Sequence, residues 1–202
     1  MTRPVRQAGA AERDAVARVL VEAFAEDPII GWILPDARNT EAARSAFFTQ
    51  ATRMHLRDGR VETTAELEAV ALWYSPDSPP RDWFGRIVDD ARAFVSTLRA
   101  TGTALVRAVR LYQTMSQQRP PEPHWYLASI GTRVAARGQG AASSLLAERL
   151  SVCDETRLAA YLESSSAANL PFYQRHGFEI VQELRIGDSP PLWPMLREPR
   201  AR

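Results

Sequence analysis

Lysine is absent from this sequence of 202 residues, in which 25 arginines face 24 acidic residues. The absence excludes Schiff-base chemistry on a lysine, a phosphate-binding loop that ends in Lys-Ser/Thr, and a kinase-type Lys–Glu pair. The formal net charge of +1 gives no overall attraction to nucleic acid or to an anionic membrane. We therefore expect neither nucleic acid nor a membrane among the partners of the chain.

Cysteine and histidine are also scarce. The single cysteine, Cys153, excludes an intrachain disulfide and a zinc site built from paired cysteines. The three histidines, His55, His124 and His176, stand far apart and share no metal-ligand spacing. No apolar run approaches the roughly 18 residues of a membrane span, and the N-terminus lacks a signal-peptide pattern. These observations predict a reduced, cytoplasmic protein without a metal ion.

The length and the 45% hydrophobic content suit one globular domain over residues 1–202. The apolar spacing predicts strands and helices that alternate most clearly in the last third, which favours a mixed α/β sheet flanked by helices. The Asp27-Pro28 step should end the first helix, because the residue before a proline avoids the helical region. Expected strands lie near Val5 and over 61–64, 69–74, 125–132, 160–163, 179–184 and 192–196; expected helices cover 16–24, 40–58, 87–98, 105–112, 141–153 and 169–175.

A glycine-containing turn joins the strand over 125–132 to the helix that follows it. In this turn, Gly138 and Gly140 allow a tight bend and leave the backbone accessible to a ligand. The new helix offers unpaired N–H groups and the positive end of its dipole, which suit a pyrophosphate, and Arg137 can add charge. The glycine spacing does not fit a dinucleotide fold. The alternative is an ordinary strand–helix turn with no ligand.

Two stretches in the last third carry a family resemblance. Residues 130–132 and 137–142 resemble the acetyl-CoA-binding motif of the GNAT superfamily of N-acetyltransferases, and residues 162–165 and 169–178 resemble its second motif. Residues 23–28, 121–128 and 169–178 are further similar to the puromycin N-acetyltransferase-like members. Thr132 stands where the superfamily usually has valine, residues 133–135 replace its acidic-proline turn, and Ala142 replaces a glycine. None of these changes removes a backbone donor.

The resemblance implies a binding mode for acetyl-CoA. Pantetheine would pair with the backbone of the strand, and the pyrophosphate would lie on N–H groups of the turn and of the first helical residues. Asn169 would contact the cofactor arm, although it could instead cap its own short helix. The implied cofactor-binding residues are Ile130, Thr132, Arg137, Gly138, Gly140, Ala141, Ala142, Ser143 and Asn169.

The resemblance also implies two catalytic residues. Tyr173 matches the tyrosine that protonates the departing thiolate, and Glu163 would take the amine proton directly or through water, or would bind a cationic amine. The alternatives are a core tyrosine and a strand-end carboxylate in solvent. His124, Tyr126 and Trp32 are candidates for the acceptor pocket, and an ordinary aromatic core is the alternative. Trp125 and Tyr126 should face opposite sides of their strand.

Together these features predict a GNAT-type enzyme that acetylates a primary amine by direct transfer in a ternary complex. Residues 1–118 would form the acceptor side and residues 120–196 the acetyl-CoA side. The predicted acceptor is a small molecule such as an aminonucleoside antibiotic of the puromycin kind, which would make the protein an antibiotic-resistance enzyme. Three alternatives stay open: a protein or peptide amino terminus as acceptor, a longer acyl-CoA as donor, and a non-catalytic acyl-CoA sensor. The chain could act as a monomer or as a homodimer.

Overall fold

The computed structural model describes residues 3–34, 40–77 and 102–200. Within them, a seven-stranded mixed sheet has the order β1-β2-β3-β4-β5-β7-β6. Strands β4 and β5 are parallel, and the other neighbouring pairs are antiparallel. The strands are β1 (Val5–Gln7), β2 (Arg60–Thr64), β3 (Ala69–Tyr74), β4 (His124–Thr132), β5 (Ala159–Ser164), β6 (Glu179–Ile180) and β7 (Trp193–Arg197).

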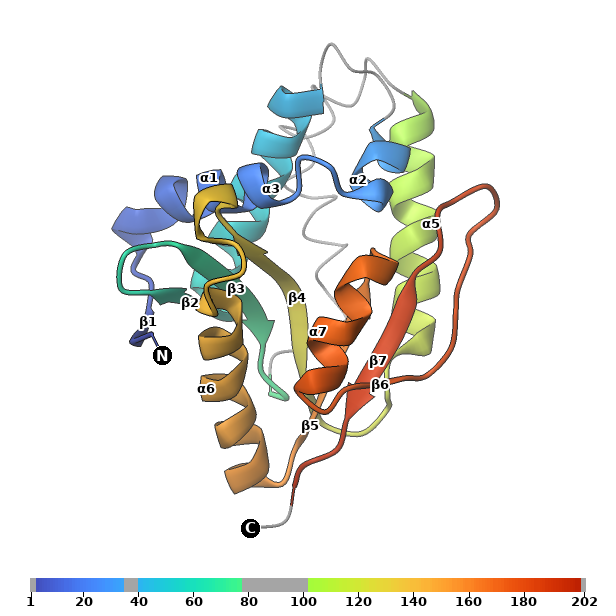
Figure 1. The fold of residues 1–202 in the computed structure, drawn as a ribbon. Coiled ribbons are helices and arrows are strands. Elements are labelled where there is room, and N and C mark those ends of the chain that lie inside the picture. The colour runs from blue at the N-terminus through green and yellow to red at the C-terminus, as the bar shows by residue number, and fades with distance from the viewer. Residues whose placement is uncertain (1–2, 35–39, 78–101, 201–202) are drawn as a thin grey trace.

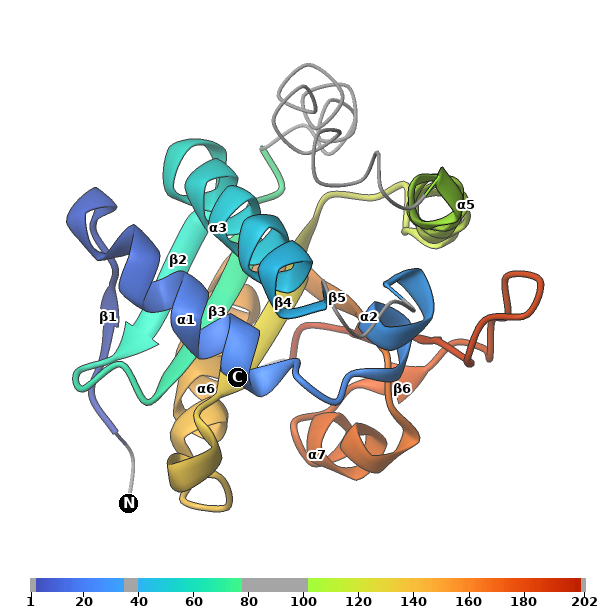
Figure 2. The ribbon, with the colours of Figure 1, turned by 90° about the horizontal axis from the view of Figure 1, so that it is seen from above.

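Helices cover both faces of the sheet (Figures 1 and 2). On β3, Val70 and Leu72 pack with α1 and α3, whereas Ala71 and Trp73 pack with α6 on the other face. The alternation follows from the two-residue period of a strand. The two cores on the two faces make this a single-domain α/β fold. The helices are α1 (Arg13–Ala23), α2 (Pro28–Ile33), α3 (Thr40–Asp58), α5 (Gly102–Gln118), α6 (Ala141–Thr156) and α7 (Leu170–Arg175).

Most of the predicted elements are confirmed, and α3 has the predicted bounds. The apolar segment after Pro28 forms a helix, α2, because the Asp27 carboxylate accepts hydrogen bonds from the N–H groups of Ile29 and Ile30 at 3.0 and 2.9 Å. Such a cap, with proline in the first turn, starts a helix as well as ending the previous one. The predicted strand over 179–184 is wrong in extent: β6 is two residues long, and an isolated bridge joins Leu184 to Leu192. The helix predicted over 87–98 lies outside the described residues.

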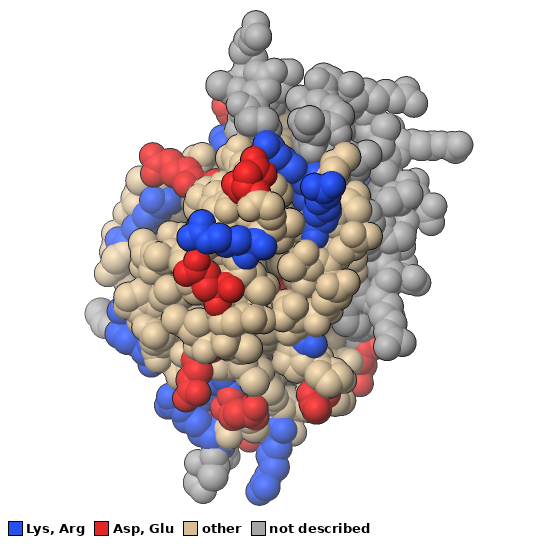
Figure 3. All heavy atoms as spheres, turned by 90° about the vertical axis from the view of Figure 1, so that its right-hand side faces the viewer, with Lys and Arg blue, Asp and Glu red and all other residues tan. Residues whose placement is uncertain are grey.

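The surface carries both signs of charge. On the described part of the face that Figure 3 shows, basic and acidic side chains are interspersed without a large patch of either sign. No helix within the described ranges is long and apolar enough to cross a membrane.

The close packing of α1 on β4 gives a stability prediction. A Cβ on Gly131 would lie 2.7 Å from the Cβ of Ala23 and 3.2 Å from a Leu20 methyl group. Gly131→Ala should therefore lower the free energy of unfolding by about 1–3 kcal/mol through overpacking, measured by urea denaturation. Gly31→Ala on α2 is the matched control, because nothing lies within 4 Å of the added carbon. Equal stability of the two variants would contradict the close approach of α1 to β4.

Candidate functional site

The site begins where β4 and β5 part. The two strands pair only from His124 with Ala159 to Leu127 with Leu162, although β4 continues to Thr132. At this point the register of β4 against β3 shifts by one residue, which leaves Ala128 as a bulge. Bulges of this kind bend a strand and often lie next to active sites. The parted strands open a cleft of about 680 Å³ that extends to the N-terminus of α6.

The turn before α6 forms one end of the cleft. Gly138 and Gly140 have φ angles of 73° and 83°, in the left-handed region that other residues adopt only with strain. Gly140 is the N-cap of α6, so the N–H groups of the next residues have no partner inside the helix. Every predicted cofactor residue lines the cleft: Ile130, Thr132, Arg137, Gly138, Gly140, Ala141, Ala142, Ser143 and Asn169.

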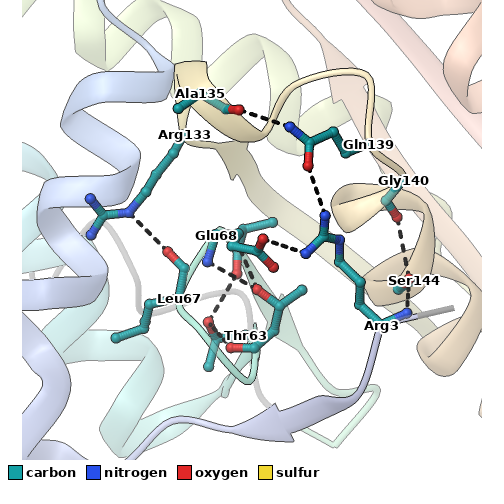
Figure 4. A network of polar contacts seen from close by, with 11 residues as sticks. Arg3, Thr63, Leu67, Glu68, Arg133, Ala135, Gln139, Gly140 and Ser144 are labelled. Carbon is teal, nitrogen blue, oxygen red and sulfur yellow. Dashed lines mark hydrogen bonds and ion pairs between the residues drawn. The ribbon is translucent and has the colours of Figure 1, made fainter. Parts of the chain in front are cut away.

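Polar contacts from the N-terminal segment and from the β2–β3 connection brace this turn (Figure 4). The Gln139 amide donates to the carbonyl of Ala135 at 2.9 Å and accepts from the Arg3 guanidinium at 2.9 Å. Arg3 also forms an ion pair with Glu68 in the β2–β3 connection. The backbone N–H of Arg3 donates to the Ser144 hydroxyl at 2.9 Å. The N-terminal segment and the β2–β3 connection therefore hold the turn in place.

Two cofactor candidates have more specific placements. The guanidinium of Arg137 donates to the carbonyl of Ala23 at 3.2 Å, which ties the turn to the end of α1. Asn169 precedes α7, but its side chain makes no capping hydrogen bond. The capping alternative is therefore wrong, and the contact of Asn169 with a cofactor stays a prediction.

A second, smaller cavity of about 190 Å³ adjoins the cleft. It lies between helices α2, α3 and α5 and the sheet face that carries Tyr74 and Tyr126, and most of its walls are apolar. The cleft and the cavity share the residues Phe24, Asp27, Ala128, Ser129, Glu163 and Ser165. This shared wall is where a ligand in the cleft and a ligand in the cavity would meet.

Glu163 belongs to this shared wall. Its side chain is only 1% exposed, so the alternative of a carboxylate in solvent is wrong. Burial raises the pKa of Glu163 to about 7, against the opposing effects of the Arg119 charge and of the nearby Tyr126 and Tyr161 hydroxyls. The Nε of Arg119 lies 3.9 Å from Oε1 of Glu163, and Oε1 has no hydrogen-bond partner among the described residues. A carboxyl group with this pKa can exchange a proton near neutral pH.

Asp27 and Tyr173 lie on the cleft side of the shared wall. One carboxylate oxygen of Asp27 caps α2, and the other accepts from the Ser165 hydroxyl. The Tyr173 ring packs in the core against Phe178, and the residue also lines the cleft, so its role as a proton donor stays a prediction. Burial, with a smaller effect from the Asp27 charge, raises the pKa of Tyr173. The phenol therefore stays protonated at neutral pH and is available as a proton donor.

The structure does not bring all predicted acceptor residues together. Tyr126 lines the second cavity and faces away from Trp125, whose ring lies under the Arg149 guanidinium. Trp32 is not among the residues that line the cleft or the second cavity, and its indole N–H donates to Asp188 at 3.1 Å. His124 lines neither space and hydrogen-bonds the Glu122 carbonyl at 2.7 Å.

Sequence reasoning missed three residues of the second cavity. Arg119 follows α5 and places its guanidinium carbon 3.9 Å from the centre of the Tyr126 ring, with 9% of its side chain exposed. The rings of His55 of α3 and Tyr74 of β3 are in contact, with their centres 4.1 Å apart and their planes tilted by 40°. The apolar spacing of α3 placed His55 on the buried face, but no local signal pointed to a cavity there. Only the packing of α3 and α5 over the sheet brings these side chains together.

Cys153 is not among the residues that line the cleft or the second cavity. Cys153 is fully buried in the α6 core, and burial raises the pKa of its thiol to about 11. Among residues 3–34, 40–77 and 102–200, no cluster of three His, Cys, Asp or Glu side chains could hold a metal ion.

Comparison with known proteins agrees with this geometry. Residues 51–178 match the model of the acetyltransferase (GNAT) family. An uncharacterized N-acetyltransferase of Schizosaccharomyces pombe is 24% identical over 193 residues, which cover 91% of this chain and 78% of the relative. A crystal structure from Corynebacterium glutamicum, named histone acetyltransferase HPA2 and related acetyltransferase, is 28% identical with a TM-score of 0.74 and covers 100% and 99% of the two chains. Arylalkylamine N-acetyltransferase 2 of Aedes aegypti has the same fold, at 11% identity, TM-score 0.66 and coverage of 98% and 99%.

Proposed function

Because the chain belongs to the acetyltransferase (GNAT) family, we propose that it transfers the acetyl group of acetyl-CoA to a primary amine of a small molecule, directly within a ternary complex. One observation carries the proposal. The buried Glu163, with a pKa of about 7, lies in the wall shared by a long cleft and a separate cavity. Two substrates held in these two spaces would meet beside a proton acceptor, and such positioning supplies much of the rate gain in a two-substrate transfer.

The cleft fits acetyl-CoA, which supplies the activated acyl group. The glycine turn and the first residues of α6 present N–H groups suited to a pyrophosphate. Within the described part of the chain, the edge of β4 beyond Leu127 has no strand partner on the β5 side, which leaves backbone groups of Ile130 and Thr132 for the amides of pantetheine. These contacts would fix the thioester end near Glu163 and Tyr173.

In the proposed reaction, Glu163 accepts a proton and Tyr173 donates one. An amine bonds to a carbonyl carbon only through its neutral form, so a proton must leave the nitrogen, and Glu163 accepts it directly or through a water molecule. The carbon–sulfur bond then breaks, and the departing thiolate takes a proton from the Tyr173 hydroxyl. Asp27, hydrogen-bonded to Ser165 beside them, adds a second carboxylate that attracts a cationic amine.

The first test is the release of CoA thiol from acetyl-CoA with puromycin, polyamines, aminoglycosides and short peptides as acceptors. Turnover of puromycin would assign antibiotic inactivation as the activity. Turnover of another small amine would support the proposal, with that amine as the acceptor in place of puromycin. Binding of acetyl-CoA without turnover of any amine would contradict it and leave the sensor alternative.

A protein amino group is the second candidate acceptor, because the relative from Corynebacterium glutamicum is named after a histone acetyltransferase. The small second cavity with apolar walls favours a small amine instead. Faster turnover of peptides than of any small amine would decide for the second candidate. Competition between acetyl-CoA and longer acyl-CoA esters would settle the donor.

The pair of Arg119 and Glu163 gives a pH prediction. The Arg119 charge lowers the pKa of Glu163, so Arg119→Gln should raise that pKa further above its ordinary value. Because the base must be deprotonated, the acid limb of kcat/KM, expected near pH 7 in the wild type, should move to higher pH. Measuring both proteins with the same amine removes the contribution of the amine's own titration. An unmoved limb would show that Glu163 does not set the profile.

A further inference from the structure

The second cavity has one polar end and one apolar middle. Glu163, Asp27 and Ser165 lie where it meets the cleft. Beyond them most of the walls are apolar side chains of α2, α3 and α5, which include Ile33, Phe47 and Met115, and the Arg119 cation lines the cavity 3.9 Å from Glu163. A second ammonium group in this middle part would lose its hydration without a carboxylate beside it, which is strongly unfavourable. The cavity therefore suits a compact apolar body that carries one charge.

A second polar group lies in the wall that α3 contributes. The Nδ1 of His55 is 2.7 Å from the carbonyl oxygen of Ala51, and a carbonyl only accepts, so Nδ1 carries the proton. Burial lowers the pKa of His55 to about 4, which keeps the ring neutral at physiological pH. Its Nε2 is then a bare acceptor, buried in the cavity wall and without a partner among the described residues. The hydroxyl of Tyr74, whose ring contacts the His55 ring, is likewise buried and has no partner among the described residues.

The sheet register separates these groups from Glu163. Tyr74 on β3 pairs with Tyr126 on β4, which pairs with Tyr161 on β5, and Glu163 lies two residues further along β5. Two strand spacings amount to roughly 10 Å across the sheet, and two residues along β5 add roughly 7 Å at a right angle, so Tyr74 and Glu163 lie roughly 12 Å apart on the sheet. This is the span of one aromatic ring with a short aminoalkyl chain, which would place the amine at Glu163 and the far edge of the ring near His55.

We infer that the second cavity selects primary amines with a single charge on an aryl-sized apolar body, and that Nε2 of His55 accepts a hydrogen bond from a hydroxyl or N–H group at the far end of that body. The inference rests on the proposed function for the identity of the cavity as the acceptor site. A buried donor or acceptor left without a partner is unusual in a folded protein, so a group supplied by the ligand explains the bare Nε2. His55 is then a residue that sets specificity and takes no part in the proton transfers.

Tyramine and phenethylamine differ only in the hydroxyl and form the matched test pair. The wild type should show a kcat/KM for tyramine about tenfold above that for phenethylamine, as one buried hydrogen bond allows. His55→Phe keeps an aromatic ring but removes the acceptor, and should reduce this ratio to about one, with the larger loss falling on tyramine. Tyr74→Phe, which keeps the aromatic ring, tests the second hydroxyl in the same way. Spermidine should be a poorer acceptor than either amine.

Binding measured by calorimetry, with CoA present, separates the inference from the proposed function. Tighter binding of tyramine than of phenethylamine, lost in His55→Phe, supports the inference even if no amine is acetylated. Two outcomes overturn the inference and leave the proposed function intact, provided that several amines are acetylated. In the first, the wild type has equal kcat/KM values for tyramine and phenethylamine. In the second, the ratio of these two values is the same in His55→Phe as in the wild type. Preference for spermidine would also overturn it.

Discussion

Tyr173→Phe should lower kcat by about 10²- to 10³-fold, the usual contribution of a positioned general acid, with little change in the KM for acetyl-CoA. The raised pKa keeps the phenol protonated, so the hydroxyl is the group that is lost. The ring stays in place and continues to pack against Phe178, so the melting temperature should not change. Steady-state kinetics at saturating acceptor would measure the effect.

Tyr161→Phe is the matched control for this variant. Tyr161 is also buried, but its hydroxyl lies near Glu163 and the residue does not line the cleft. The control should lose less than tenfold in kcat. Equal losses in the two variants, or an unchanged kcat in Tyr173→Phe, would remove Tyr173 from the proposed proton transfer.

Glu163→Gln should lower kcat/KM by about 10²- to 10⁴-fold, because the amide cannot accept the amine proton. The acid limb expected near pH 7 should also disappear from the residual activity. That second readout distinguishes a lost base from a disturbed pocket, which would lower the rate at every pH and keep the limb. Initial rates between pH 5.5 and 9 would show both effects.

Protein stability provides the control for Glu163→Gln. The folded-state pKa of Glu163 lies above its unfolded value, so the stability linked to this group is present at low pH and is lost as the pH rises through about 7. At pH 8 the buried charge opposes folding, and removing it should leave the free energy of unfolding unchanged or higher. A large loss of stability at pH 8 would indicate that the carboxylate is structurally required.

The parts of the site that local sequence encodes could be predicted, and the parts that packing creates could not. Gly138 and Gly140 mark the turn through their own backbone requirements, and they line the cleft as expected. By contrast, His55 and Arg119 are 64 positions apart, and only the packing of α3 and α5 over the sheet brings both into the wall of one cavity.

Trp32 illustrates the same limit within a single short element. As part of an extended apolar segment it is a reasonable acceptor residue. In the helix that Asp27 initiates, Ile29 and Ile33 take the cavity side, while Trp32 turns to Asp188 and the Arg107 guanidinium. The helix that this cap starts determines which side chains face the second cavity, and the composition of the segment did not show it.

Arg3 and Gln139 brace the glycine turn before α6. This bracing couples the order of the N-terminal segment to ligand binding in the cleft. The N-terminal segment holds the turn through contacts with Gln139 and Ser144, so ordering that segment would favour the turn conformation that lines the proposed acetyl-CoA site. Thermodynamic linkage makes the coupling reciprocal, and a ligand in the cleft must strengthen the anchoring of the N-terminal segment by the same free energy. Amide hydrogen exchange in β1 would then report occupancy of a cleft that β1 does not line.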